Sequence, residues 1–370
     1  MRAAIPRLVA PALAAALLSM ASVGCGAAQR RDVSTPPDCG ALRSFTGGLT
    51  ATAALPSATG PTSPRSGVPL RQVADVPLPG PAVRFDYQSV DTAASRLYIA
   101  HMNAGTLLVF DMKARRVIAD LPGFPSVHGV LAVPELGKMY AAVTGRHEVA
   151  VVDATTLGTR ARLGPIGYPD GIAYAPDSKR VYVSDESAAG LELAIDGSSD
   201  RVIGRIPVGG EAGNTIYDPG SYCVLVAVQT ANQVVAIDPR GDSIVGRYSL
   251  EGASHPHGLS IDPERRLLFV ANEGNAKLLV VDLRSMRVIS KHPVGDDPDV
   301  LAFDPGLGRL YVAAESGTVS VFRVEGRDLV REGDLRMPHA HTVAVDPRTH
   351  FVYFPLQDVK GGPVLRIMAP

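Results

Sequence analysis

Seven positions at regular intervals in the chain carry side chains suited to binding or acid–base chemistry. Six of the seven are histidine or aspartate, and the spacing between successive positions is 42 to 44 residues: Asp86, His128, Asp170, Gly213, His257, Asp299 and His341. Carboxylates and imidazoles bind metal ions, form hydrogen bonds and transfer protons. Each position precedes a similar apolar segment, so we expect the seven positions to form a ring.

Two interpretations of this ring remain open. In the structural one, polar side chains at the start of a strand hold the joint with the neighbouring repeat through hydrogen bonds to its backbone. In the functional one, the ring is the polar floor of a site for a small molecule or a peptide.

Metal binding is a narrower form of the functional interpretation. The elements His255-Pro-His257 and His339-Ala-His341 would each place two imidazoles on one side of an extended strand. Together with His128, they could converge on a divalent transition metal at about 2 Å. The candidate metal ligands are therefore His128, His257 and His341.

A second set of polar residues follows the apolar segments and is expected in loops at the same mouth as the ring. Its members are Asp185, Glu186, Gln229, Asn272, Glu273, Glu315 and Gln357. Such a rim either contacts a cationic ligand or a basic partner, or is an ordinary solvated loop. The ligand-binding candidates taken from it are Glu186, Asn272 and Glu273.

The elements that must position these residues are seven copies of one supersecondary unit. One large residue recurs at the same place in each copy, again 42 to 44 residues apart: Tyr98, Tyr140, Tyr182, Leu225, Phe269, Tyr311 and Tyr353. Each copy contains short β-branched and apolar runs separated by Asp, Gly or Pro, which is typical of strands. Four strands at this period predict a blade, and the chain is predicted to be an all-β, seven-bladed β-propeller of four-stranded antiparallel blades.

The two ends of the repeat region are expected to complete the ring together. Only 17 residues follow Tyr353, enough for two strands, 351–356 and 363–368. Residues 71–79 resemble an outer strand and residues 83–90 an inner one. The last blade is therefore predicted to be closed by N-terminal strands, which leaves no long unpaired edge.

The strand ends carry the family resemblance. The Leu-Tyr-Val-Ala-like strands and the Val-Val-Asp or Ala-Ile-Asp strand ends resemble the YVTN repeat family with its YncE-like members, over residues 69–370. The resemblance implies a seven-bladed extracytoplasmic or surface propeller, often without known catalysis; some relatives bind nucleic acid. Related folds include calcium-dependent lactonases with Glu, Asn and Asp on the axis, but a ring that is half histidine suits a hard cation poorly.

The N-terminal region predicts export. Residues 1–24 have a basic start, an apolar run and small residues before Cys25, which is the pattern of a signal peptide. The segment Ser22-Val23-Gly24-Cys25 resembles a bacterial lipobox, so Cys25 is the predicted lipid-attachment site of a periplasmic or cell-surface lipoprotein. Residues 25–68 are predicted to be the lipidated cysteine and a disordered tether, and Cys39 and Cys223 are expected to stay unpaired.

Charge and missing motifs limit the functions that the sequence supports. The chain has 36 basic and 37 acidic residues, which gives no electrostatic footprint for nucleic acid. It has no nucleophile elbow, phosphate loop or Cys-x-x-Cys pair. We therefore expect a monomeric, non-enzymatic binding or scaffold module that offers its axial face to a protein, peptide or small ligand. The alternatives are a metal-assisted lactonase or lyase that uses the axial ring, and a nucleic-acid-binding propeller.

Overall fold

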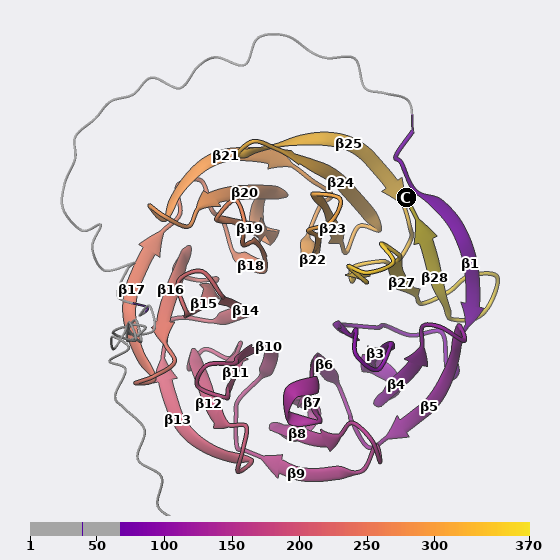
Figure 1. The fold of residues 1–370 in the computed structure, drawn as a ribbon, viewed down its shortest axis with the longest axis horizontal. Helices are drawn as coiled ribbons and strands as arrows, with labels where there is room; N and C mark the ends of the chain where they lie inside the picture. Colours follow the sequence, from indigo (N-terminus) through magenta and orange to yellow (C-terminus); the bar gives the residue numbers. More distant parts are fainter. Residues whose placement is uncertain (1–38, 40–66) are drawn as a thin grey trace, which may run out of the picture. The chain divides into compact units, whose positions relative to one another are not determined.

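Seven four-stranded antiparallel sheets surround one axis in the computed structural model, which describes Cys39 and residues 67–370 (Figure 1). Short runs of β-branched and apolar residues form the strands, and Asp residues terminate them. Asp111 is typical of these turns: its Oδ1 accepts hydrogen bonds from the backbone N–H groups of Lys113 (2.9 Å) and Ala114 (2.8 Å). The predicted fold class is confirmed.

The blades are numbered along the chain. Blade 1 consists of β2 (Gln88–Asp91), β3 (Arg96–His101), β4 (Thr106–Asp111) and β5 (Arg116–Pro122). Blade 2 consists of β6 (Val127–Val133), β7 (Lys138–Val143), β8 (Glu148–Asp153) and β9 (Thr159–Leu163). Blade 3 consists of β10 (Pro169–Ala175), β11 (Arg180–Asp185), β12 (Leu191–Asp196) and β13 (Arg201–Pro207). Blade 4 consists of β14 (Ala212–Asp218), β15 (Cys223–Val228), β16 (Gln233–Asp238) and β17 (Ser243–Ser249). Blade 5 consists of β18 (Pro256–Asp262), β19 (Leu267–Asn272), β20 (Lys277–Asp282) and β21 (Arg287–Pro293). Blade 6 consists of β22 (Pro298–Asp304), β23 (Arg309–Ala314), β24 (Thr318–Glu325) and β25 (Asp328–Arg336).

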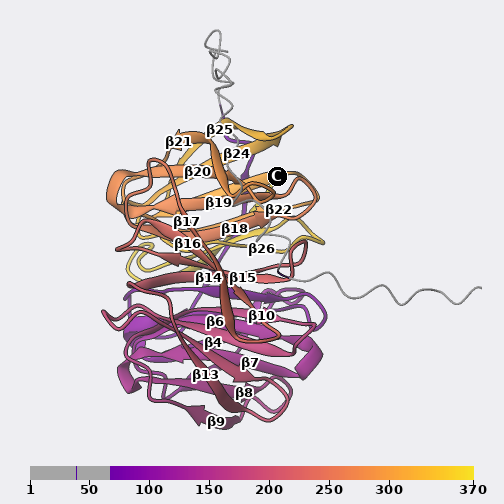
Figure 2. The same cartoon turned by 90° about the vertical axis from the view of Figure 1, so that its left-hand side faces the viewer.

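Blade 7 combines β26 (Ala344–Val345), β27 (Val352–Leu356) and β28 (Val364–Ala369) with β1 (Arg71–Pro77). Within residues 67–370, four short 3-10 helices lie in turns: η2 (Met102–Ala104), η3 (Pro134–Leu136), η4 (Thr144–Arg146) and η5 (Glu273–Asn275). In every blade the first strand is innermost and the fourth is outermost; Figure 2 shows the ring edge-on, with outer strands β13, β17 and β21 toward the viewer.

The large residue that marks each repeat lies in the second strand of its blade. All seven are buried, with at most 1% of their surface exposed. They pack into clusters that join adjacent blades, for example Tyr182 of β11 with Val226 and Val235 of blade 4. The core is therefore a set of apolar layers between neighbouring sheets, and the axis is left to the polar residues that begin the inner strands.

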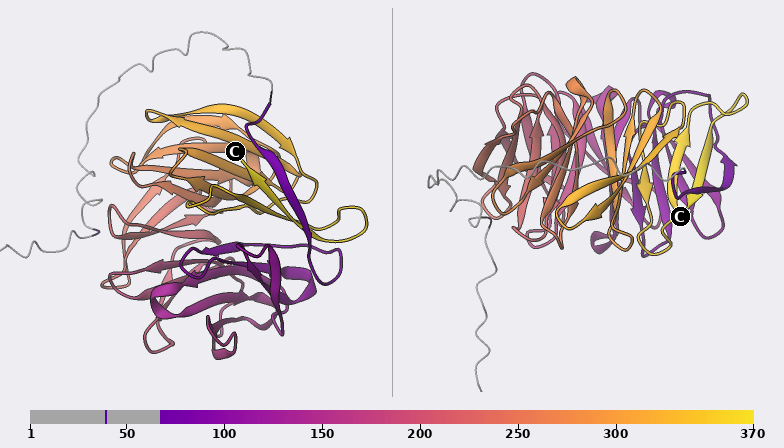
Figure 3. Two further views of the ribbon diagram at one scale, coloured as in Figure 1. Left: turned by 45° about the vertical axis from the view of Figure 1, so that its right-hand side comes forward. Right: turned by 90° about the horizontal axis from the view of Figure 1, so that it is seen from above.

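Blade 7 is closed by one strand from the N-terminal side. β1 pairs antiparallel with β28 (Figure 3). Arg366 donates two short hydrogen bonds, of 2.8 and 2.6 Å, to the Asp75 carboxylate. A register irregularity between Gln72 and Ala74 matches those between the third and fourth strands of the other blades, so β1 acts as an outer strand. The second predicted N-terminal strand forms the inner strand of blade 1, where β2 begins at Gln88.

The expectation of two unpaired thiols is wrong: Cys39 and Cys223 form a disulfide, with their Cα atoms 5.1 Å apart. Cys223 is the first residue of β15. Cys39 is buried there beside Leu225 and Leu268.

The predicted signal peptide, the lipid-attachment cysteine and most of the predicted tether fall in residues 1–38 and 40–66, which lie outside the described residues. Within the described part of the chain, no helix has the length and apolar character needed to cross a membrane.

Candidate functional site

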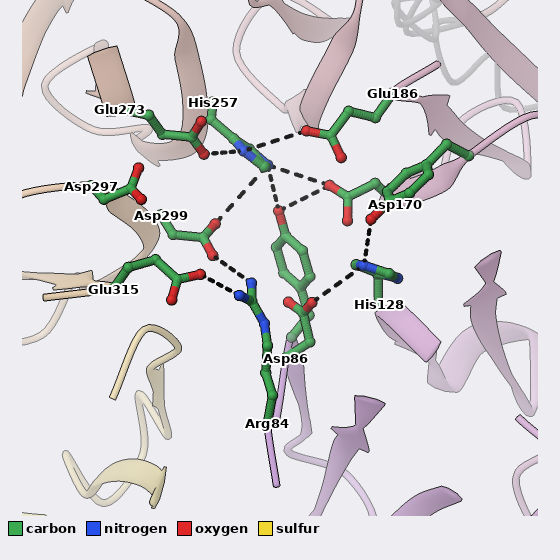
Figure 4. A pocket seen from close by; sticks show the side chains of 12 residues that line it. Arg84, Asp86, His128, Asp170, Glu186, His257, Glu273, Asp297, Asp299 and Glu315 are labelled. Atoms are coloured by element: carbon green, nitrogen blue, oxygen red, sulfur yellow. Dashed lines mark hydrogen bonds and ion pairs between the residues drawn. The ribbon is translucent and has the colours of Figure 1, made fainter. Parts of the chain in front are cut away.

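The seven-membered ring opens into a pocket at one mouth of the axis, with a volume of about 220 Å³ (Figure 4). Every lining side chain has a polar or charged group, and seven of the twelve are carboxylates. The lining residues are Arg84, Asp86, Tyr87, His128, Tyr168, Asp170, Glu186, His257, Glu273, Asp297, Asp299 and Glu315. The pocket is therefore strongly acidic, with one arginine and two imidazoles to balance its charge.

The single glycine of the ring determines how His257 lies. A Cβ atom at Gly213 would meet both the Cα and the Cδ2 of His257 at 3.2 Å. Because blade 4 contributes no side chain at this position, the imidazole of blade 5 reaches across to blade 3, where its Nε2 lies 3.3 Å from Asp170 Oδ2. The missing side chain at Gly213 thus allows His257 to contact Asp170, although the two residues are 87 positions apart.

His257 is also held on its other side. Its Nδ1 lies 2.6 Å from Glu273 Oε1, while its Nε2 faces the Tyr87 hydroxyl at 3.2 Å. Tyr87 in turn donates to Asp170 at 3.3 Å. A carboxylate that orients an imidazole whose other nitrogen faces a pocket is an arrangement capable of proton transfer.

A second group lies across the axis, where blades 6, 7 and 1 meet. His341 Nε2 stands 3.9 Å from Asp86 Oδ1 and 4.0 Å from Asp299 Oδ2, too far in both cases for a hydrogen bond. All three side chains are buried, and His341 Nε2 and Asp299 Oδ1 have no hydrogen-bond partner. Donor atoms of the three residues nevertheless lie within 4.8 Å of one another.

Arg84 is the only arginine that lines the pocket. Its Nη1 pairs with Glu315 Oε1 at 2.6 Å, and its Nη2 is 4.0 Å from Asp299 Oδ2. On the opposite wall, His128 Nε2 faces the Tyr168 hydroxyl at 3.0 Å and Asp86 Oδ2 at 3.9 Å. Positive and polar groups therefore contact only part of the carboxylate set.

Burial and crowding of like charges change the acidity of the pocket groups. Burial raises the pKa of Asp170 well above its ordinary value, and the charge of Glu186 adds to the effect. Burial also raises the pKa of Asp299 to about 7, although His257 and His341 oppose it. Burial lowers the pKa of His257, but its hydrogen bond to Glu273 and the charges around it raise that pKa well above the ordinary value.

The structure brings most of the predicted site residues together. The pocket is lined by Asp86, His128, Asp170, His257 and Asp299 of the ring and by Glu186 and Glu273 of the rim, and His341 lies beside it against Asp86 and Asp299. Asn272 does not line the pocket. Its amide is fully buried and donates to the carbonyl oxygens of Val270 (3.0 Å) and Lys277 (3.2 Å), so it supports the loop that carries Glu273.

The three histidines proposed as metal ligands are distributed differently. His257 and His341 belong to separate groups, each with two carboxylates, and His128 contacts Tyr168. The premise of alternating His-x-His strands is wrong, because His255 and His339 have φ values of 48° and 65°. A left-handed residue breaks the alternation of an extended strand, and both side chains are exposed.

Sequence reasoning missed four lining residues. Arg84, Tyr168 and Asp297 each stand two positions before a ring residue, and Tyr87 follows one directly. The signal for the first three was present, because the turn that leads into each inner strand recurs at the same period. Tyr87 gave no such signal, because neighbouring residues of a strand normally face opposite sides.

The comparisons with known proteins agree with the repeat. No family model matches the chain. Over 96 residues, 26% of this chain, it is 30% identical to proteins named uncharacterized protein YncE from Salmonella typhi and Salmonella typhimurium, and the match spans 27% of their length. This chain resembles YncE. It is also 24% identical over 221 residues, 59% of this chain and 40% of the relative, to antigen Lp49 of Leptospira interrogans. These relatives and the seven blades support a YncE-like propeller.

Solved structures share the architecture of this YncE-like chain. A chain of hydrazine synthase from Kuenenia stuttgartiensis superposes with a TM-score of 0.67 at 15% identity, covering 76% of this chain and 94% of that one. A chain of a mitotic checkpoint complex gives a TM-score of 0.69 at 11% identity, covering 88% and 99%. At these identities the likeness concerns the fold alone.

Proposed function

We propose that this protein is a non-enzymatic binding module of the cell envelope whose axial pocket binds a small cationic ligand. The observation that carries this proposal is the pocket's composition: seven carboxylates surround about 220 Å³ with a single arginine among them. Carboxylates held close together in a partly dehydrated site repel one another, and a bound cation relieves that repulsion.

The size of the pocket supports a small ligand. Sites for drug-sized molecules enclose about 300–1,000 Å³. A volume of about 220 Å³ suits an ion with its waters, or the ammonium or guanidinium end of a larger partner. The nucleic-acid alternative loses support at this mouth, because phosphates would approach a surface of their own charge.

A second candidate function, a metal-assisted lactonase or lyase, is favoured by one specific observation. The pKa of Asp299 is raised to about 7 by burial, so this carboxyl group can both donate and accept a proton near neutral pH. His257, which Glu273 orients, is close by, with its Nε2 4.0 Å from Asp299 Oδ1. Turnover of a lactone panel that is lost in Asp299→Asn would replace the non-enzymatic proposal with this one.

The binding proposal is tested by calorimetric titration of the purified protein with argininamide, putrescine, Mn²⁺ and Zn²⁺. We expect at least one of these cations to bind with a dissociation constant below about 1 mM, corresponding to roughly 4 kcal/mol. Binding should be lost in the triple variant Glu186→Gln, Glu273→Gln, Glu315→Gln. If none of the four cations binds, the proposal is wrong.

A matched control removes the same charge elsewhere. Glu251, Glu264 and Glu325 are exposed and lie outside the pocket. Their triple glutamine variant should bind as the wild type does, because exposed charges outside the pocket are screened by water and salt. Equal loss in both triple variants would mean that net charge, rather than the pocket, controls binding.

The location of the protein in the cell envelope is a separate part of the proposal. We expect the signal peptide to be removed before Cys25 and this cysteine to carry the lipid, which would anchor the protein to a membrane. Mass spectrometry of the mature N-terminal peptide tests this directly. A mature chain that begins downstream of residue 25 and remains soluble would contradict it.

A further inference from the structure

Three buried side chains from adjacent blades converge on one point beside the axial pocket. Asp86 precedes β2 in blade 1, Asp299 lies in β22 of blade 6, and His341 precedes β26 in blade 7. Their exposed fractions are 2%, 6% and 3%. One donor atom from each lies within 4.8 Å of the other two.

The separations within this group are unusual for a group held by hydrogen bonds. His341 Nε2 is 3.9 Å from Asp86 Oδ1 and 4.0 Å from Asp299 Oδ2, beyond hydrogen-bond range. Ligands that bind one ion at about 2.0–2.2 Å from either side stand at most about 4.4 Å apart. Both distances from His341 are therefore within the span of two ligands of one ion.

Two unpartnered atoms point to the same conclusion. His341 Nε2 and Asp299 Oδ1 are buried and have no hydrogen-bond partner. Leaving a buried polar atom without a partner is unfavourable, so such atoms call for a specific explanation. The His341 nitrogen faces Asp86 and the Asp299 Oδ2 oxygen, whereas the Asp299 Oδ1 oxygen faces His257 Nε2 at 4.0 Å. A cation bound between His341, Asp86 and Asp299 would supply the partner that the His341 nitrogen lacks.

We propose that Asp86, Asp299 and His341 bind one divalent first-row transition metal ion. This inference rests on the proposed cation-binding function and specifies the cation. Two carboxylates and one imidazole form a mixed oxygen and nitrogen donor set, which suits manganese, iron or zinc better than calcium. The three protein ligands leave coordination positions open toward the pocket for water or for part of a partner molecule.

Arg84 is the competing cation at this site. Its Nη2 is 4.0 Å from Asp299 Oδ2, but its short ion pair, of 2.6 Å, is with Glu315 at the rim. Glu315 therefore holds the guanidinium away from the metal ligands. It follows that Arg84→Gln should bind the metal more tightly than the wild type, whereas Glu315→Gln, which frees the guanidinium to approach Asp299, should bind it more weakly.

The test is a titration of the full chain with Mn²⁺ after dialysis against a chelator, followed by electron paramagnetic resonance. We expect one ion per chain, with nitrogen coupling from one imidazole in the spin-echo modulation. His341→Gln should abolish that coupling, and both His341→Gln and Asp299→Asn should weaken binding by at least about 10-fold. Circular dichroism and thermal unfolding identify any variant that fails to fold, in which case Arg84→Gln, with its expected gain in affinity, still tests the site.

The matched control is His147→Gln, which removes an exposed histidine outside the pocket and leaves Asp86, Asp299 and His341 in place. Its Mn²⁺ affinity should stay within about threefold of the wild type, because an exposed side chain outside the ligand set interacts with the site only through solvent and salt. Nitrogen coupling that disappears in His257→Gln but persists in His341→Gln would overturn the assignment. Binding of argininamide without any Mn²⁺ binding would overturn this inference alone, and binding of neither would overturn the proposed function as well.

Discussion

Single residues explain why this axial mouth differs from a symmetric ring. Gly213 is the one position of the seven that lacks a side chain, and the space it leaves is occupied by His257, which reaches Asp170 from two blades away. One imidazole thereby contacts carboxylates from two directions, with Glu273 on its Nδ1 and Asp170 on its Nε2. The ring is consequently divided into two groups that share Asp299.

The protonation of His257 should depend on Glu273. Burial lowers the pKa of His257, and the hydrogen bond and charge of Glu273 are the largest influences that raise it. In Glu273→Gln we therefore expect this pKa to fall, because the variant loses both the hydrogen bond to the carboxylate and its negative charge. A ¹⁵N NMR titration of the imidazole measures it, with Glu264→Gln as the control. An unchanged titration in Glu273→Gln would show that the contact is not made.

A buried glutamate outside the pocket should make stability depend on pH. Glu192 is fully buried on β12. The Thr215 hydroxyl lies beside it but donates its hydrogen bond to the Leu225 carbonyl oxygen rather than to the Glu192 carboxylate. Burial raises its pKa well above the ordinary value. The folded state therefore binds a proton that the unfolded state releases above its ordinary pKa of about 4.5, so stability falls as the pH rises through and above that value.

Replacing Glu192 with a neutral residue should remove this loss. We expect Glu192→Gln to be more stable than the wild type at pH 7, because the neutral amide does not have to take up a proton on folding, as the buried carboxylate does. At pH 4 the difference should be small. Urea unfolding at both pH values measures it, and a variant that is equally destabilised at both would contradict the protonation argument.

At the residue scale, the sequence predicted the ring but not its contacts. Period and residue type were enough to place Asp86, Asp170 and Asp299 at one mouth. The inward path of His257 depends on the absence of a Cβ atom at Gly213, a contact between blades 4 and 5 that the repeat pattern does not specify. The pairing of His-x-His side chains failed for a similar reason, because left-handed residues at His255 and His339 precede the strands.

Among the elements, β1 decides whether the ring is closed. It covers the outer edge of β28 and repeats the register irregularity of the other outer strands. The sequence predicted this closure correctly, because too few residues follow β27 to complete a blade. An uncovered β28 would present a row of unpaired backbone groups to solvent or to another chain.

Removing β1 should therefore destabilise the whole propeller. We compare chains that begin at residue 67 and at residue 78, both with Cys223→Ser so that neither has a free thiol. The shorter chain should lose more than about 4 kcal/mol, because it loses a complete strand with its hydrogen bonds. Urea unfolding and the onset of proteolysis near β28 measure the difference. Equal stability of the two chains would show that β1 does not close the ring.

For the molecule as a whole, the disulfide fixes where the N-terminal segment meets the propeller. Cys223 begins β15 and lies opposite Asp218 in the register of the β14–β15 hairpin. Ala212 and Val228 lie opposite each other at the other end of this hairpin, which is the pocket end. The disulfide is therefore at the end away from the pocket. Cys39 is thus attached to the face away from the acidic mouth.

The disulfide should also contribute to stability. It closes a loop of 184 residues in the unfolded chain, and Cys39→Ser would open it. We expect the free energy of unfolding to fall by about 2–4 kcal/mol, the usual range for such a link. Urea unfolding of the oxidised wild type, the reduced wild type and Cys39→Ser measures this; no difference among the three would mean that the bond leaves the unfolded ensemble unconstrained. The sequence left this pairing undetected, because nothing in the composition around Cys39 showed that it returns to blade 4.

The most direct test of the whole account is anomalous diffraction from crystals of the full chain soaked with Mn²⁺, with data collected on both sides of the manganese edge. We expect one strong difference peak per molecule at the axial mouth, within about 2.3 Å of carboxylate oxygens of Asp86 and Asp299 and of His341 Nε2. A seven-bladed ring with an intact acidic pocket and no peak in it would contradict the claim that this mouth is a cation-binding site.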